Sequence, residues 1–433
     1  MKEELLHAAW NFGLFRQTAL YTGDGDEVEI LHPGMYNRNA GPDFFNGRIR
    51  IGGVQLAGNI EIHVKSDDWY AHGHQADPAY ENVILHVVWD EGRPVRCGRR
   101  HIPTLSIRHK VWPEAIENFN RLMASLERIP CEKQVHTVPD AIVRLWVARM
   151  AAERLQMKAE SALHLVSDLK YSPEQAFFIL LAGNFGFHVN REPFEEMAKG
   201  MDVKLLSKHK NSQFQIEAML FGRAGLLEGD FADTYAAELQ KEFSFLRLKY
   251  GIVPMNGVSW KFGRTRPANF PTVRLAQLAA LVYRSRFLMS AILESESTQA
   301  LRRLFLAEPS AYWEKRYDFD KPSRPGAKNL SASSVDLLMV NTVAPFLYYC
   351  GMRGGDEALK EKAMSVLESV KPEHNHITAV WRGVGFSPRC AADSQGMIHL
   401  FRSYCSQRLC LRCGIGNKLL SGSVHRESIS ATL

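Results

Sequence analysis

The sequence predicts an α+β fold: a mixed α/β domain over residues 1–110, a larger all-α domain over residues 111–420, and a disordered tail over residues 421–433. Before residue 110, short segments of alternating or β-branched apolar residues are separated by Gly- and Pro-containing turns, a pattern typical of strands. After residue 111, apolar residues recur at helical spacing and Gly- and Pro-containing loops separate the segments. The last residues are polar and predict a frayed end.

The first domain is expected to begin with a helix over residues 3–15, whose apolar side chains gather near one face. Strands are expected at residues 18–21, 28–31, 48–51, 54–65, 83–89 and 104–109. The run Gly23-Asp24-Gly25-Asp26 predicts the turn between the first two strands.

The second domain is expected to consist of helices. Apolar periodicity predicts them over residues 112–126, 141–166, 173–181, 193–198, 214–221, 235–248, 272–293, 298–305, 335–349 and 357–367.

Composition places the chain among soluble globular proteins, because 45% of its residues are hydrophobic and 23% are charged. We see no apolar run of about 18 residues and therefore expect no membrane span and no membrane partner. The acidic start, Lys2-Glu3-Glu4, does not resemble a secretion signal, so we expect a cytoplasmic protein. A net charge of +6 permits a nucleic-acid partner without strongly favouring one, and the sequence does not identify protein partners.

The segment Gly58–Ser66 carries the most chemistry in the first domain. Ile60, Ile62 and Val64 alternate with Glu61, His63 and Lys65. On a strand the three polar side chains share one face, spaced about 7 Å apart per step. A carboxylate, an imidazole and an ammonium group on one rigid strand favour a metal or proton-transfer site. The alternative is an ion pair between Glu61 and Lys65 on a solvated strand, with Asp43 capping a turn.

Asp43 could complete such a site for Mg²⁺ or Mn²⁺, since hard cations prefer oxygen ligands. The order of a helix, strands, Pro42-Asp43, and then Glu61 and Lys65 on the next strand resembles the PD-(D/E)XK nuclease superfamily. The resemblance implies a nuclease-like domain in which Asp43 and Glu61 bind the metal, His63 assists and Lys65 orients water. Two features differ from that pattern: His63 stands two residues before Lys65, where an acid is expected, and only about seventeen residues separate Lys65 from the next strand.

A second group of candidate ligands follows the strand. Asp68, His72, His74 and Asp77 fall within ten residues, and a His-x-His pair suits Zn²⁺ or Mn²⁺. His63 could reach the same pocket, which would make the protein a metallohydrolase acting on a small substrate. The alternative is a turn whose side chains bind its own backbone. We expect His86, alone on an apolar strand, to be a core residue.

Three of the seven cysteines form the tightest cluster in the sequence: Cys405, Cys410 and Cys413. Their spacing suits an iron–sulfur cluster or Zn²⁺, with Cys131 or Cys390 as the fourth ligand. Some nucleases of the superfamily above hold an iron–sulfur cluster with one early and three late cysteines. Cys131 with the late three is similar in layout, although the late spacing runs in the opposite order. The alternative is a buried group of reduced thiols.

The loop before residue 272 contains Arg264 and Arg266, and Arg274 follows it. A rigid loop with three arginines could bind phosphate and so position nucleic acid. In the simpler interpretation, which we prefer, Arg266 and Arg274 pair with acids such as Glu217, and Asn269 ties the loop to the backbone.

Several segments also resemble an uncharacterised bacterial family defined as a domain of unknown function, numbered 2851. The matching stretches include Gly41–Phe44, Gly58–Trp69, His72–His74, Tyr80–Val88 and the cysteine cluster. This resemblance implies no activity. The sequence therefore leaves three hypotheses: a metal-dependent nuclease, a metallohydrolase of small substrates, and a non-enzymatic nucleic-acid-binding or assembly protein with a structural cysteine site.

Overall fold

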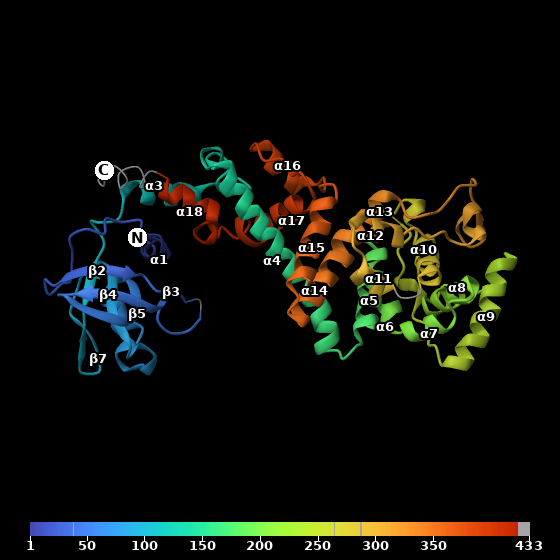
Figure 1. Ribbon diagram of the computed structural model, residues 1–433, viewed down its shortest axis with the longest axis horizontal. Helices are drawn as coiled ribbons and strands as arrows, with labels where there is room; N and C mark the ends of the chain where they lie inside the picture. Colours follow the sequence, from blue (N-terminus) through green and yellow to red (C-terminus); the bar gives the residue numbers. More distant parts are fainter. Residues whose placement is uncertain (38, 264, 286–287, 423–433) are drawn as a thin grey trace. The chain divides into compact units, whose positions relative to one another are not determined.

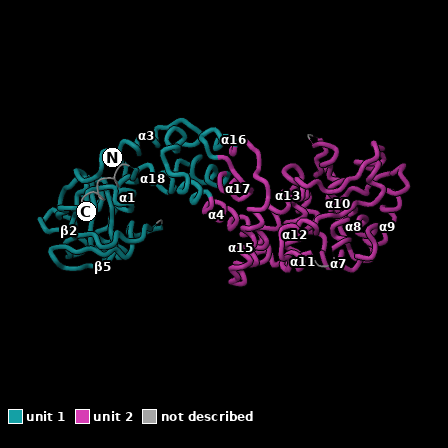
Figure 2. The backbone as a smooth tube through the Cα atoms, turned by 45° about the horizontal axis from the view of Figure 1, so that its top comes forward, with its two compact units in different colours: residues 1–147, 379–386, 398–433 teal, residues 148–378, 387–397 magenta. Residues whose placement is uncertain are grey.

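The computed structural model describes residues 1–37, 39–263, 265–285 and 288–422. The chain forms two compact units (Figure 2): residues 1–147, 379–386 and 398–433 make the first, and residues 148–378 and 387–397 make the second. The first contains the main sheet and the second is mostly helical, which confirms the expected α+β class (Figure 1). Most of the expected tail, residues 423–433, lies outside the described residues.

The first unit is organised around a mixed sheet with the strand order β1-β2-β4-β5-β6-β9, and β3 pairs with β4. Its strands are β1 (Leu20–Tyr21), β2 (Glu27–His32), β3 (Met35–Tyr36), β4 (Phe44–Ile51), β5 (Val54–Lys65), β6 (Val83–Asp90) and β9 (Thr104–Ser106). Strands β2, β4 and β5 are antiparallel neighbours, whereas β6 runs parallel to β5 and β9 runs parallel to β6. Strand β5 therefore has an antiparallel neighbour, β4, on one side and a parallel neighbour, β6, on the other.

The parallel pair β5–β6 requires a crossover, and this crossover is short. It contains α2 (Asp68–Ala71) and the 3₁₀ turns η1 (His74–Ala76) and η2 (Pro78–Tyr80). Trp69 and Tyr80 fix it to a small apolar core that includes Val83 and residues of the hairpin β7 (Val95–Cys97) and β8 (Arg100–Ile102). Two large aromatic side chains thus hold the crossover where a long helix is absent.

Helix α1 (Glu3–Phe12) contacts β5 and buries Leu5, Leu6 and Trp10. It ends before the expected residue 15, because Gly13 has φ +62° and its amide binds the last carbonyls of the helix. The expected strand over residues 54–65 has the predicted bounds, whereas the one over residues 104–109 ends at Ser106, where a turn begins.

The first unit extends beyond residue 110. It contains α3 (Pro113–Ala124), η3 (Val135–Thr137) and the start of α4 (Asp140–Ser167). The C-terminal part of the chain returns to this unit with the π-turn η8 (Phe401–Cys405), η9 (Cys410–Arg412) and α18 (Gly414–Ser421). The Asn118 side chain donates to the Leu419 carbonyl at 3.0 Å and so joins α3 to α18.

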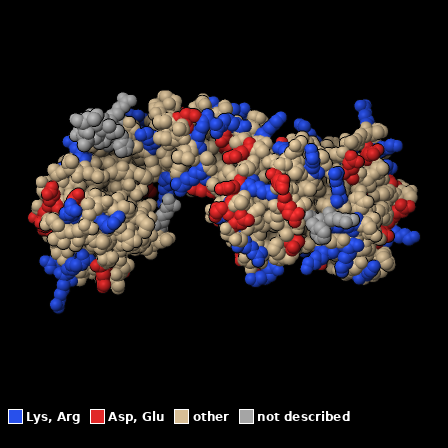
Figure 3. All heavy atoms as spheres, viewed as in Figure 1, with Lys and Arg blue, Asp and Glu red and all other residues tan. Residues whose placement is uncertain are grey.

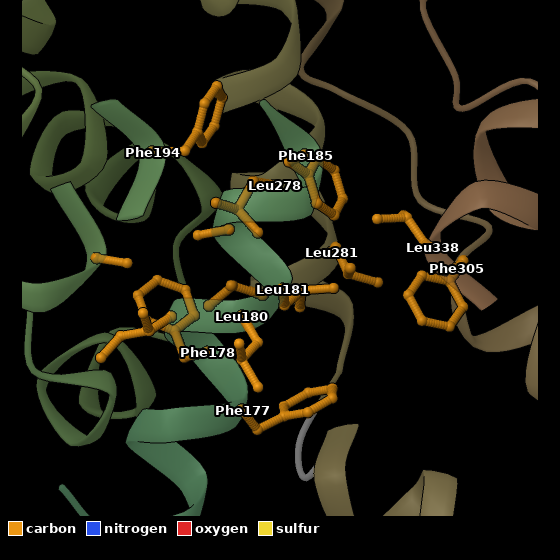
Figure 4. Packing of buried hydrophobic residues seen from close by; sticks show 14 of the residues in the cluster. Phe177, Phe178, Leu180, Leu181, Phe185, Phe194, Leu278, Leu281, Phe305 and Leu338 are labelled. Carbon is orange, nitrogen blue, oxygen red and sulfur yellow. The ribbon is translucent and has the colours of Figure 1, made fainter. Parts of the chain in front are cut away.

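The second unit is a layered helical domain. Its helices include α5 (Pro173–Phe185), α6 (Arg191–Lys199), α7 (Val203–Lys208), α8 (Gln213–Arg223), α9 (Thr234–Tyr250), α10 (Pro271–Arg284), α11 (Leu288–Glu294), α12 (Thr298–Leu304), α13 (Ala332–Leu338), α14 (Ala344–Gly354) and α15 (Glu357–Ser369). Helix α5 is buried along almost its whole length and lies at the centre, where Phe177, Leu181 and Phe185 pack with side chains of α10 and α13 (Figure 4). The single helix expected over residues 272–293 was wrong: α10 ends at Arg284 and α11 begins at Leu288. Helices α16 (His376–Gly383) and α17 (Ala391–Leu400) each span a boundary between the units along the chain.

One helical stretch of the described chain, Ala332–Gly354, is long and apolar enough by composition to cross a membrane. It comprises α13, the π-turn η7 (Met339–Val343) and α14. Of its most apolar window, 67% is buried inside the protein, and the core helix of a globular domain meets the same criteria. This stretch is therefore weak evidence for a membrane span.

Candidate metal centre

Strand pairing brings the polar face of β5 against two other polar side chains. Glu61 lies opposite His86 across the parallel β5–β6 ladder, so their side chains share a face of the sheet. On the other side, the pairing of Phe44 with Ile60 places Asp43 beside Glu61. Glu61, His63 and His86 are all at least 95% buried, so this face of β5 is covered rather than solvated.

Asp43 and Glu61 hold each other in place through the backbone. The Asp43 amide donates to Glu61 Oε2 at 3.0 Å, and the Ile62 amide donates to Asp43 Oδ2 at 2.9 Å. This reciprocal arrangement fixes two carboxylates next to one another in a mostly buried environment. Two adjacent carboxylates repel each other unless a cation or proton compensates them.

His63 is the centre of the histidine group. Its Nδ1 lies 2.9 Å from His86 Nε2, and its Nε2 lies 3.1 Å from His72 Nδ1. Glu61 Oε1 lies 3.6 Å from the same His63 Nε2 and 3.3 Å from His74 Nε2. One nitrogen of His63 thus faces the other ligand atoms, while the opposite nitrogen contacts His86.

Gly73 allows the crossover to present two histidines in succession. Its φ of +78° is left-handed, and it separates His72, which caps α2, from His74, which starts η1. His74 is further held by Tyr80, whose ring stacks on it at a centroid distance of 3.8 Å. His72 is exposed whereas His74 is buried, so the group opens to solvent at His72.

The protonation states of these groups suit metal ligation. Burial, with the neighbouring His74 and His72, lowers the pKa of His63 to about 3. Burial and the nearby His63 also hold the pKa of His86 well below its ordinary value. Both rings are therefore neutral at physiological pH, which is the form that binds metals. Burial raises the pKa of Glu61, and the charge of Asp43 adds to that rise while the contact with His74 opposes it.

The spacing of the ligand atoms matches one bound ion. A tetrahedral Zn²⁺ with Zn–N bonds of about 2.0–2.1 Å holds its ligand atoms about 3.3 Å apart. The His63–His72, His74–Glu61 and His63–Glu61 contacts are 3.1, 3.3 and 3.6 Å. Among the described residues, His63, His72 and His74 are also a group whose ligand atoms all lie within 4.8 Å of one another.

A family model for proteins of unknown function, DUF2851, matches residues 3–376. The chain belongs to the DUF2851 family. No curated protein and no solved structure matches the chain. The resemblance to this family that the sequence suggested is thereby confirmed.

Of the site residues predicted from the sequence, this DUF2851 chain brings together Asp43, Glu61, His63, His72 and His74. Asp77 instead accepts a hydrogen bond from the Ala79 amide and caps η2. Asp68 likewise accepts from the Lys65 amide at 2.9 Å. The Lys65 side chain is exposed at the end of β5, on the same face as Glu61 and His63 by alternation.

His7 is a site residue that sequence reasoning missed. It lies on α1, and its Nε2 is 3.2 Å from Asp43 Oδ2. Burial lowers the pKa of His7, but the hydrogen bond to Asp43 and the charges of Asp43 and Glu3 outweigh it, so the pKa is raised. Its place on the polar side of an amphipathic helix gave no signal, because only the packing of α1 on the sheet brings it to Asp43. His86, expected to be a core residue, is buried and contacts His63.

The predicted phosphate loop of the DUF2851 chain is only partly described, because Arg264 lies outside the described residues. Arg266 is exposed, whereas Arg274 is 5% exposed and donates to Asn269, Gln277 and Ser334. Arg274 therefore packs within the helical unit and makes these contacts with neutral partners.

Glu217, which the simpler interpretation paired with these arginines, has other partners. Its Oε2 accepts hydrogen bonds from Tyr235, Ser310 and Trp313. Burial raises the pKa of Glu217, although these hydrogen bonds oppose the rise. The four cysteines predicted as a metal site line one cavity of the first unit.

Proposed function

We propose that this protein is a metal-dependent hydrolase whose first unit binds one divalent cation through Glu61, His63, His72 and His74. The convergence of His63, His72 and His74 within reach of a single ion carries the proposal, and Glu61 lies 3.6 Å from His63 and 3.3 Å from His74. Nitrogen ligands suit Zn²⁺ and the carboxylate also accommodates Mn²⁺, so we propose these ions ahead of Mg²⁺.

The surrounding residues support a working metal site. A metal-binding histidine is normally oriented by a hydrogen bond from its second nitrogen, and His86 is placed to do this for His63. The exposed His72 leaves the group open on the solvent side, where a substrate could approach. A bound ion supplies charge to polarise a substrate oxygen and to acidify water.

Two further groups are placed to handle protons or water. His7 is paired with Asp43 and is partly accessible, since its side chain is 13% exposed. Its raised pKa lets it carry a proton near neutrality, as a general acid must. Lys65 is expected to orient the attacking water, because its long side chain projects from the same strand face as the ligands.

We propose a phosphodiester in nucleic acid as the substrate, which makes the protein a nuclease. Asp43 immediately precedes β4 and Glu61 lies within the neighbouring strand β5, and this placement of the two carboxylates supports the proposal. In this chain His63 occupies the position two residues after Glu61, where that superfamily has its lysine. Lys and Arg are interspersed with Asp and Glu on the visible face of the helical unit (Figure 3), so any nucleic-acid contact there would be local.

The histidine-rich ligand set favours a second candidate, a metallohydrolase acting on a small substrate. Three imidazoles and one carboxylate resemble the donors of zinc hydrolases more than the oxygen-rich sites of Mg²⁺-dependent nucleases. This candidate uses the same ion, so substrate preference is what separates it from the nuclease.

The deciding experiment measures bound metal and hydrolysis on the same purified full-length chain. We expect about one Zn²⁺ or Mn²⁺ per chain beyond any metal held by cysteine, and metal-dependent cleavage of DNA or RNA that Glu61→Gln abolishes. Glu29→Gln is a matched control, because Glu29 is an exposed carboxylate of the same sheet that pairs with Arg50. Cleavage of small phosphate esters but not of nucleic acid would favour the second candidate. If both Glu61→Gln and His74→Ala kept the metal content of the unsubstituted chain, the result would contradict the site.

A further inference from the structure

One early cysteine and three late cysteines meet inside the first unit. Cys131, Cys405, Cys410 and Cys413 line one small cavity. Cys131 follows α3, whereas the other three come from the turns that precede α18. Each of these residues is 7–8% exposed, so the four cysteines are largely shielded from solvent. Cys390, the alternative fourth ligand, belongs to the second unit.

Without a bound metal, burial keeps these thiols in the protonated form. Burial, followed by the neighbouring cysteines, raises the pKa of Cys131 and of Cys405 far above the ordinary value. Burial likewise raises the pKa of Cys410 to about 12. A positively charged metal centre would stabilise all four thiolates at once, and its binding would release their protons.

Backbone and indole N–H groups act on the Cys413 sulfur. The amides of Ile415 and Gly416 and the indole of Trp146 act on its sulfur and lower its pKa, against a larger rise from burial to about 11. N–H groups directed at sulfur stabilise metal-bound thiolates, because they share the negative charge.

Two glycines make this turn possible. A Cβ on Gly416 would lie 2.1 Å from the Cys410 carbonyl oxygen, and a Cβ on Gly414 would lie 2.6 Å from the Trp146 ring. The run Gly414-Ile415-Gly416 therefore brings backbone and indole close to the cysteines. This close approach explains two glycines at the start of a helix, where they lower helix propensity.

The separation of the sulfurs distinguishes between metals. A single tetrahedral Zn²⁺ with Zn–S bonds of about 2.3 Å would hold its sulfurs about 3.8 Å apart. Within the described chain, no three of these cysteines form a group with all sulfurs inside 4.8 Å, whereas the histidine group meets that limit. Cysteines that bind different iron atoms of a cluster are spread more widely than the ligands of one ion.

We infer that Cys131, Cys405, Cys410 and Cys413 hold an iron–sulfur cluster that ties the C-terminal segment to the loop after α3. The cluster is a structural centre separate from the histidine group, because thiolates and the nitrogen–oxygen ligands select different metals. It fixes α18 in the first unit in addition to the Asn118–Leu419 hydrogen bond.

The test is chemical analysis of the full-length chain purified without oxygen. We expect iron and acid-labile sulfide in equal amounts, with visible absorption that bleaches on reduction. Cys413→Ala should lose at least nine-tenths of both, whereas Cys350→Ser should keep them, because Cys350 is a half-buried cysteine of the second unit. His74→Ala should keep the sulfide, which separates this cluster from the proposed hydrolase site.

Two results would overturn the inference. Stoichiometric zinc without sulfide in the native chain would assign the cysteines to a single zinc ion. If the native chain held neither iron nor sulfide after anaerobic reconstitution, the four cysteines would be reduced thiols without a metal. Both are measured on the unsubstituted protein, so they stand even if Cys413→Ala fails to fold.

Discussion

Excess Zn²⁺ should raise the thermal unfolding midpoint of the full-length chain, and His74→Ala should remove most of that rise. The four proposed ligands meet only when β5 and the crossover are folded, so the ion binds the native state and not the unfolded chain. At a free concentration of 100 times the dissociation constant, such binding stabilises the native state by about 2.7 kcal/mol. For a unit of roughly 190 residues, each kcal/mol shifts the midpoint by about 2–4 °C, so the rise should be about 5–11 °C.

Calorimetry with and without Zn²⁺, followed by a chelator, measures this shift for each variant. His74→Ala also removes the stack on Tyr80 and so lowers the metal-free midpoint, which is why the shift within each variant is the quantity compared. His109→Ala is the control, because His109 is an exposed histidine of the same unit. Equal shifts in the native chain and in His74→Ala would refute the assignment of the site, since any zinc held by the cysteines contributes to both.

Three further predictions concern neighbouring features. Gly73→Ala forces a non-glycine residue to φ +78° and should cost about 1–2 kcal/mol in denaturant unfolding, with weaker metal binding, because it disturbs the spacing of His72 and His74; unchanged metal affinity would contradict this. Lys65→Ala should lower kcat at least tenfold while metal content stays unchanged, and equal kcat would remove its proposed role. Glu217→Gln should gain stability relative to the native chain as the pH rises from about 4.5, because the native chain has a raised Glu217 pKa and loses stability when that carboxyl ionises. The measurement is the free energy of unfolding of both chains at about pH 4 and pH 8. A larger advantage of the variant at pH 4 than at pH 8 would contradict this prediction.

The strand that carries the site could be predicted from the sequence because the signal is local. Alternation from Val54 to Lys65 gives both the bounds of β5 and the shared face of Glu61 and His63. The neighbouring position of Asp43 follows from pairing two adjacent strands, which is the shortest connection available in the chain. These predictions needed no knowledge of the tertiary fold.

Other parts of the site depend on packing and were not predictable. His7 meets Asp43 only because α1 lies against β5, and helix periodicity does not indicate which strand a helix contacts. The spacing of the late cysteines could not choose between Cys131 and Cys390, because that choice depends on how the chain returns to its first unit. Asp77 looked like a ligand from its position, yet the Pro78 turn uses its carboxylate as a cap.

The two proposed metal sites can coexist in one unit because their ligands differ in kind. Neutral imidazoles and a carboxylate favour Zn²⁺ or Mn²⁺, whereas four thiolates bind iron–sulfur clusters or zinc. Cys97 is buried near the histidine group, but its sulfur contacts the His74 carbonyl and the small core around Trp69, and burial raises its pKa. Cys97 is not a member of the histidine group that could hold one ion, so it does not mix the two ligand sets. Substitution of the ligands of one metal should therefore leave the other metal in place. Nonspecific binding of metal to histidine and cysteine side chains would not show this independence.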